Sequence, residues 1–193
     1  MTAIFTRRSV RDFLDKPVEP EKLERILRAA FEAPSAHNRR PWEFLVLTDQ
    51  KDREAAAGMS PWAKMCLRAP VVLAACVDLR KGDPDYEASA AAGLVGADAA
   101  AGEDIFWIQD ISAAVENALL QITGEGLGGV WLGWYPGKSR VRAFMDAFGL
   151  PPHIVPAALV ALGYPAKETH PKDRFDPAKV HYGRYGTPGT ERG

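Results

Sequence analysis

The sequence is poor in cysteine. Only Cys66 and Cys76 occur among its 193 residues, which is too few for a disulfide scaffold. Cys76 lies inside an apolar run, where a thiol is typically a small buried hydrophobic group. Cys66 lies on an expected helix, and we expect a structural role for it as well.

The sequence also has no excess of either charge. With 24 Lys and Arg against 25 Asp and Glu, the formal net charge is −1, so a nucleic-acid-binding surface is not expected. The longest apolar run, residues 69–77, is far shorter than the roughly 20 residues that span a bilayer. The N-terminus lacks the apolar core of a signal peptide. We therefore expect a cytoplasmic protein with no membrane partner.

Motifs for metal and hydrolytic chemistry are missing. The four histidines, His37, His153, His170 and His181, show no zinc-ligand spacing. Neither HExxH, CxxC nor the G-x-S-x-G nucleophile elbow occurs. We expect no metal site, and we assign no side chain as an obligate catalytic acid or base.

Apolar periodicity predicts helices and strands in a mixed order. The predicted helices cover residues 20–33, 51–58, 60–68, 112–123 and 139–149, and the predicted strands cover residues 43–48, 69–78, 130–134 and 155–162. Helices come in runs rather than alternating with strands. This order favours an α+β fold, with a sheet covered by helices, over a doubly wound parallel sheet. The length suits a single domain over residues 1–193.

Two segments do not fit this pattern. Residues 80–106 are rich in Ala, Gly, Asp and Glu, and we expect a mobile insertion, helical in part, that acts as a lid. Residues 164–193 are polar and too poor in apolar side chains to form a core. Ordering such a segment costs conformational entropy, so we expect this C-terminal extension to pack on a partner subunit.

A glycine-rich stretch imitates a dinucleotide site. Gly124, Gly126 and Gly129 match the G-x-G-x-x-G spacing, but that motif needs a strand before it and a helix after it, so that the pyrophosphate meets a helix N-terminus. Here a predicted helix comes first and a strand follows. We interpret the stretch as a helix C-terminus and a tight turn.

Basic residues gather near both ends of the chain. Arg7, Arg8 and Arg11 lie within five residues of one another, and Lys172 and Arg174 follow the last predicted strand. Arginine and lysine are the groups that bind a phosphate dianion. Two unrelated solvated patches are the alternative on composition alone.

Four segments, in order, resemble the nitroreductase family of flavoproteins. They are residues 7–11 (RRSVR) with Phe13, residues 34–44 (PSAHNRRPWEF), residues 109–133, and residues 163–165 followed by 171–174 and Tyr185-Gly186. The resemblance implies a mixed or antiparallel sheet flanked by helices. It also implies an intertwined homodimer that binds FMN at the subunit interface.

The resemblance assigns part of the flavin site to the two chain ends. Arg7 and Ser9, with Lys172 and Arg174, would hold the FMN phosphate and ribityl chain. Arg8 would join them or face solvent.

The flavin ring would meet other matched residues. Arg11 would lie near its pyrimidine edge, where a cation favours the charge that develops on reduction. Tyr135, Pro136 and Gly137 would bring backbone amides toward N5, with Gly137 permitting close approach.

The partner subunit would close over the same flavin with Pro34, Ser35 and Asn38. One position nearby departs from the family, which usually has glutamine where this chain has Arg40. An added cation there would raise the flavin potential or favour an anionic substrate, or else the side chain points into solvent. The sequence leaves both possibilities open.

The implied chemistry is a ping-pong reaction in which NADH or NADPH reduces FMN and the flavin then reduces a small organic acceptor, such as a nitroaromatic or a quinone. Three alternatives remain. The same fold could serve dehalogenation, flavin fragmentation or dehydrogenation. The chain could bind FMN without turnover, or it could be an unrelated α+β binding module that takes up no flavin.

Overall fold

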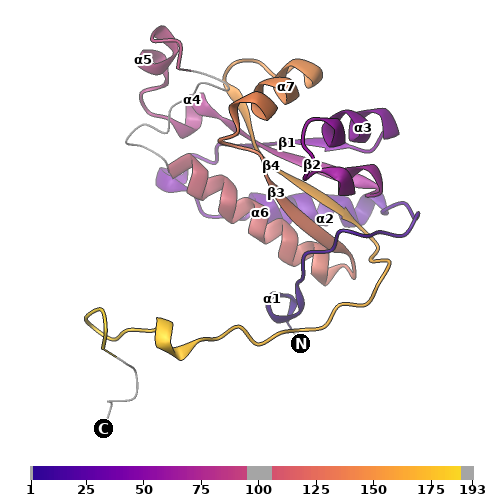
Figure 1. Cartoon of the computed structure of the whole chain (residues 1–193). Helices are drawn as coiled ribbons and strands as arrows, with labels where there is room; N and C mark the ends of the chain where they lie inside the picture. The colour runs from indigo at the N-terminus through magenta and orange to yellow at the C-terminus, as the bar shows by residue number, and fades with distance from the viewer. Residues whose placement is uncertain (1, 95–105, 188–193) are drawn as a thin grey trace.

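A computed structural model describes residues 2–94 and 106–187, and its centre is a four-stranded sheet (Figure 1). The strands are β1 (Trp42–Leu47), β2 (Val71–Asp78), β3 (Gly128–Gly133) and β4 (Ile154–Gly163), in the order β1-β2-β4-β3. All three pairings are antiparallel. The predicted α+β class and antiparallel sheet are confirmed.

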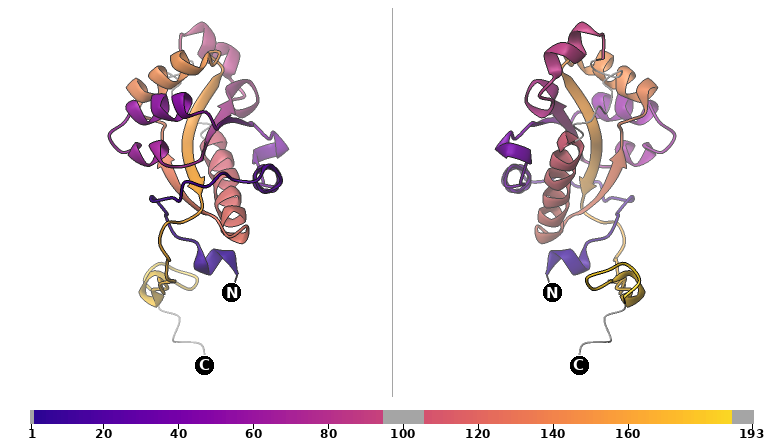
Figure 2. Two further views of the ribbon diagram at one scale, coloured as in Figure 1. Left: turned by 90° about the vertical axis from the view of Figure 1, so that its right-hand side faces the viewer. Right: turned by 90° about the vertical axis from the view of Figure 1, so that its left-hand side faces the viewer.

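Helices cover both faces of the sheet (Figure 2). On one face α6 (Phe106–Gly124) packs on the strands and α2 (Pro20–Phe31) packs on α6, while α3 (Gln50–Gly58) and α7 (Lys138–Phe148) lie on the other face. Three short helices and three 3-10 turns of the described residues complete or cap these layers. Their bounds are α1 (Ala3–Thr6), α4 (Leu79–Gly82), α5 (Tyr86–Ala91), η1 (Ala36–Asn38), η2 (Lys64–Leu67) and η4 (Pro177–Lys179).

The two central strands form the middle of the core. Every residue of β2 is buried, which explains why its sequence is a continuous apolar run rather than an alternating one. Trp107 of α6 and Phe144 of α7 are fully buried on their respective helices. The sheet is therefore enclosed between two helical layers, as the sequence predicts.

Both cysteine thiols are free and buried, which confirms the structural role predicted for them. Burial raises the pKa of Cys66 to about 11 and that of Cys76 to about 12. A thiolate is therefore disfavoured at both positions.

Two predicted helix boundaries are wrong. The helix expected over residues 60–68 shrinks to η2, because residues 60–63 form a turn in which the amide of Ala63 donates to the carbonyl of Ser60 at 3.0 Å. The helix expected from Ser112 begins at Phe106, because Trp107 and Ile111 continue its buried face.

The expected insertion at residues 80–106 is only partly described. It contains the end of α4, all of α5 and the first residue of α6, whereas residues 95–105 lie outside the described residues. A lid role stays a prediction.

The glycine-rich stretch joins a helix to a strand, as predicted. Gly124 ends α6, Gly126 has a φ of +73° in the turn, and β3 begins at Gly128. A positive φ at Gly126 is strained for other residues. The helix-then-strand order excludes the dinucleotide-binding arrangement here.

The N-terminal segment lies along the beginning of β3. Ser9 forms a parallel bridge to Gly129, and Phe13 forms an antiparallel bridge to Pro165 just after β4. After Pro165 the C-terminal extension continues past α1 and away from the body of the molecule (Figures 1 and 2). Residues 167–175 are exposed throughout.

Candidate functional site

Basic side chains from both ends of the chain meet around one cavity. Arg7 and Arg8 follow α1, and Lys172 and Arg174 lie on the C-terminal extension, yet all four line a cavity of about 540 Å³. The chain ends lie together because of the two bridges near Ser9 and Phe13. The two basic groups therefore lie together in space rather than in separate patches.

Arg8 holds the two chain ends together. Its Nε donates to the carbonyl of His170 at 2.9 Å, and its Nη2 lies 3.5 Å from the carbonyl of Lys172. Its Nη1 donates to the carbonyl of Arg7 at 2.6 Å. Because these donors satisfy backbone carbonyls, Arg8 shapes the cavity and adds positive charge to it.

The other cations differ in how far they are neutralised. The Nε of Arg7 lies 3.4 Å from Oε1 of Glu116, a residue of α6 that also lines the cavity. Within the described residues, the side chains of Lys172 and Arg174 make no hydrogen bond or ion pair. Two cations on the extension thus remain available to an anion.

The donor set of this cavity fits a phosphate. Its lining contains three arginines and one lysine against two carboxylates, Glu116 and Asp173. Guanidinium and ammonium groups in excess are the chemistry that binds a dianion. The rim is apolar and open, since Ile4, Phe5 and Phe175 are 62%, 67% and 74% exposed. A ligand with an anionic group and a flat apolar part matches both features.

Ser9 and Arg11 do not line this cavity. Both residues are exposed, and the backbone of Ser9 is held against Gly129. Their predicted roles with the ribityl chain and the ring stay predictions.

The predicted partner loop, residues 34–40, has an unusual backbone. His37, Asn38 and Arg40 have φ values of 51°, 55° and 48°, a left-handed region that residues other than glycine adopt at a cost. The hydroxyl of Ser35 accepts from the amide of Arg40 at 3.0 Å. A hydrogen bond inside the loop therefore stabilises its conformation.

Arg40 is exposed, and its Nε donates to Oδ1 of Asn38 at 2.9 Å. In this chain Asn38 thus uses its carbonyl oxygen inside the loop, while its amide nitrogen makes none of the hydrogen bonds described here. Pro34 is exposed at the beginning of the loop.

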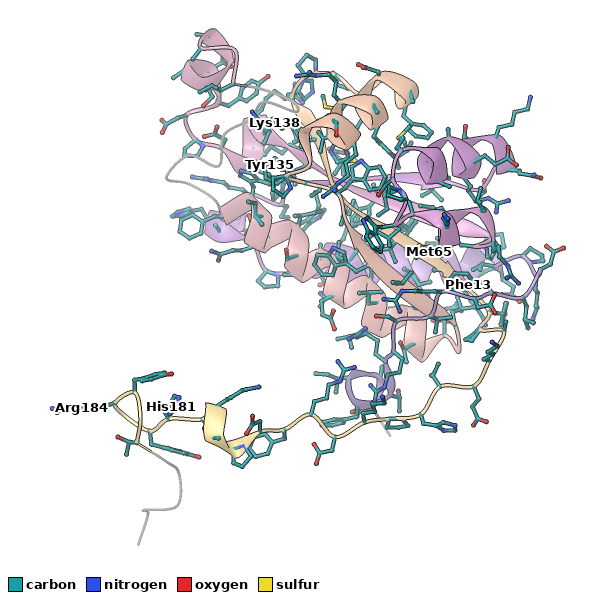
Figure 3. The ribbon with its side chains drawn as sticks, viewed as in Figure 1. Phe13, Met65, Tyr135, Lys138, His181 and Arg184 are labelled. Atoms are coloured by element: carbon teal, nitrogen blue, oxygen red, sulfur yellow. The ribbon has the colours of Figure 1, made fainter. Side chains whose placement is uncertain are left out.

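The third predicted segment follows β3. The ring of Tyr135 packs edge-on against Trp107 with centroids 4.9 Å apart, and Figure 3 shows Tyr135 beside the beginning of α7. Pro136 is exposed. A Cβ on Gly137 would lie 2.5 Å from the guanidinium of Arg140, so a larger residue here would displace the Arg140 side chain.

Within one chain the predicted site residues therefore form two groups. Arg7, Arg8, Lys172 and Arg174 line the basic cavity, whereas residues 34–40 and 135–137 flank the first turns of α6. The sequence prediction overlooked the supporting residues Trp107 and Glu116. Asp110 begins the third segment that resembles the family, together with Gln109, but the sequence assigned it no role.

Neither a membrane helix nor a metal cluster was found in the described parts of the chain. No helix within residues 2–94 and 106–187 is long and apolar enough to cross a bilayer. The same residues contain no group of His, Cys, Asp and Glu suited to a metal ion.

Comparisons with known proteins agree with this architecture. A protein from Methanothermobacter thermautotrophicus, provisionally named an NADH dehydrogenase/NAD(P)H nitroreductase, is 36% identical over 94% of this chain and 85% of its own length. A solved structure from Bacteroides thetaiotaomicron with the same provisional name is 35% identical, with a TM-score of 0.81 over 95% of this chain and 96% of the other.

A third protein brings a flavin into the comparison. A provisionally named nitroreductase of Desulfovibrio desulfuricans, solved in complex with FMN, is 27% identical, with a TM-score of 0.70 over 89% of each chain. The model of the nitroreductase family matches residues 4–164, which include the first three resembling segments and the beginning of the fourth. The chain therefore belongs to the nitroreductase family.

Proposed function

We propose that this protein is an FMN-dependent oxidoreductase that uses NADH or NADPH to reduce a small organic acceptor, such as a nitroaromatic or a quinone. The relatives' names support the nicotinamide donor, and the FMN complex of a structural neighbour supports the cofactor. The observation that carries the proposal is the basic cavity built from both chain ends.

Arg7, Lys172 and Arg174 bind the FMN phosphate in this proposal, and Arg8 keeps their backbones together. Ser9 contributes to the ribityl chain, and Arg11 places a cation near the pyrimidine edge of the ring. When bound, FMN supplies the hydride and electron transfer. The protein's part is to bind, to orient and to exclude water, so no side chain needs to act as acid or base.

The visible spectrum of the purified protein after incubation with FMN tests the cofactor. We expect flavin absorbance that remains through gel filtration. Arg174→Ala should weaken FMN binding roughly tenfold or more, since a charge-assisted hydrogen bond contributes about 1.5–3 kcal/mol. Arg184→Ala is the matched control, because Arg184 lies farther along the same extension (Figure 3) and does not line the cavity.

Two results would contradict this assignment. A protein that takes up no FMN would overturn the proposed function. A yellow Arg174→Ala variant with wild-type affinity would overturn the phosphate site. Steady-state kinetics with NADPH and a quinone should give the parallel double-reciprocal lines of a ping-pong reaction, and intersecting lines would exclude that order.

A homodimer is part of the proposal. The apolar rim of the cavity and Tyr185, which is 92% exposed, present large hydrophobic side chains to solvent in a single chain. Exposed apolar patches of this kind mark interaction surfaces, and an extension that leaves the body finds its contacts on a second copy. Residues 34–40 of the partner subunit then close over the flavin.

Light scattering measures the oligomeric state directly. We expect the mass of two chains for the wild type. Removing residues 167–193 should give monomers that have lost FMN together with the extension. A wild-type monomer with full flavin occupancy would contradict the dimer.

A further inference from the structure

The first turns of α6 contact two segments of the proposed site, which are residues 135–137 and the loop of residues 34–40 that the proposal places at the partner subunit's flavin. Trp107 packs against Tyr135. Three residues later, Oδ1 of Asp110 accepts the amide hydrogen of Ala36 at 2.8 Å. Residues three apart on a helix lie on the same face, so one helical face supports both segments.

Asp110 is a carboxylate in a buried place. It is 5% exposed and sits between Trp107 and Ile111, which are each 2% exposed. A buried carboxylate is costly unless hydrogen bonds satisfy it, and a buried amide without an acceptor is costly as well. The bond between Asp110 and Ala36 therefore ties the loop to α6.

The loop needs such a tie because three of its residues have left-handed backbones. Strained conformations persist only where the surrounding structure fixes them. The bonds of Ser35 and Asn38 to Arg40 are internal to the loop, so they fix its shape but not its place. Asp110 and the longer contact from Nη1 of Arg39 to the carbonyl of Gly82, at 3.5 Å, both tie the loop to the rest of the chain.

We propose that Asp110 is a positioning residue that holds residues 35–40 in the conformation needed at the flavin ring. The flavin part of this inference rests on the proposed function, whereas the anchoring part does not. Asp110 touches neither the cofactor nor the substrate in this proposal. It acts through the amide of Ala36.

Trypsin cleavage after Arg39 reports the position of the loop without using activity. Asp110→Ala leaves the amide of Ala36 without its acceptor, and we expect cleavage there to accelerate roughly tenfold. Asp110→Asn keeps an acceptor oxygen and should give a smaller change. The Arg40-Pro41 bond resists trypsin, so the cleavage site is unambiguous.

Glu125→Ala is the matched control. The Glu125 side chain is 11% exposed and accepts a hydrogen bond from Nε of Arg25 at 2.8 Å, just beyond the end of α6 that lies farthest from Asp110. Its loss should lower thermal stability without accelerating cleavage after Arg39. A general loosening of the fold would affect both variants alike.

The bound flavin provides the second measurement. In Asp110→Ala we expect a changed visible circular dichroism of FMN and a lower kcat, with FMN affinity changed less than in Arg174→Ala. Cleavage no faster than in Glu125→Ala would overturn the anchoring role. Faster cleavage with unchanged dichroism and kcat would overturn the flavin role of the loop, while wild-type FMN binding would leave the proposed function intact.

Discussion

Arg25 and Glu125 form a two-point ion pair that joins α2 to the turn after α6. Nε of Arg25 donates to Oε1 of Glu125 and Nη2 donates to Oε2, both at 2.8 Å. Gln121 donates to Oε1 as well, at 2.7 Å. The Arg25 bonds, with help from Gln121, lower the pKa of Glu125 from its ordinary value of 4.5 to about 2.

This pair predicts a pH-dependent part of the stability. Because the pKa of Glu125 is lower in the folded chain than in the unfolded one, its ionised carboxylate stabilises the fold. This contribution is fully present above pH 4.5 and is lost as the pH falls toward 2. Glu125→Gln should therefore lower the melting temperature by about 2–4 °C at pH 7, and the difference from wild type should shrink between pH 4.5 and 2. Thermal scans across that range measure it.

Glu24→Gln is the control, because Glu24 is 62% exposed in its pair with Arg28 and exposed pairs contribute little. A wild-type difference for Glu125→Gln that stays constant down to pH 2 would contradict the assigned pKa.

The contact between Gly128 and Val10 predicts a second effect. A Cβ on Gly128 would lie 2.5 Å from Cγ2 of Val10, which is 8% exposed. Gly128→Ala should destabilise the fold by about 1–3 kcal/mol and weaken FMN binding, because Arg7 and Ser9 lie on the displaced segment. Chemical denaturation and flavin titration measure the two effects.

Shortening Val10 should relieve this clash. In the Val10→Ala background, Gly128→Ala should cost much less than it does in wild type. Gly124→Ala is the control, because nothing lies within 4 Å of its Cβ position. Equal costs in both backgrounds would show that the clash is not the cause.

Glu116 opposes phosphate binding in the proposed site. It places a negative charge in the cavity wall and occupies Arg7 at 3.4 Å. Glu116→Gln should therefore strengthen FMN binding by roughly two- to fivefold, since a partly exposed ion pair contributes about 0.2–1 kcal/mol. The gain should shrink at high salt. Weaker binding would mean that the pair orients Arg7 for the phosphate.

The two buried thiols should be unreactive in the native protein. Because burial raises the pKa of Cys66 to about 11 and of Cys76 to about 12, little thiolate exists at pH 8. Ellman's reagent should label neither cysteine in the native state and both in guanidinium. Rapid labelling of native Cys66 would contradict its burial.

Strong local patterns made most of the fold predictable. The all-buried strand β2 and the helix α2 could be found because their apolar residues dictate where they lie. The turn at residues 60–63 and the early beginning of α6 at Phe106 could not be found, because hydrogen bonds and packing partners remote in sequence decide them.

The candidate site was predictable in its residue types but not in its arrangement. Arg7 and Arg174 could be matched to a family motif, yet their meeting depends on the bridges of Ser9 to Gly129 and of Phe13 to Pro165. The left-handed backbone of residues 37, 38 and 40 has no glycine to signal it. Asp110 was part of a segment that resembles the family, but its bond to the amide of Ala36, 74 residues away in sequence, could not be foreseen.

The joining of both chain ends at one cavity sets an order of events during biosynthesis. Arg7 leaves the ribosome before any of the four strands, whereas Lys172 and Arg174 follow after all four strands have been made. A nascent chain therefore cannot possess the proposed anion site, however well its sheet has folded. If Lys172 and Arg174 hold the FMN phosphate as proposed, a ribosome-stalled chain that lacks them would be unable to load the cofactor.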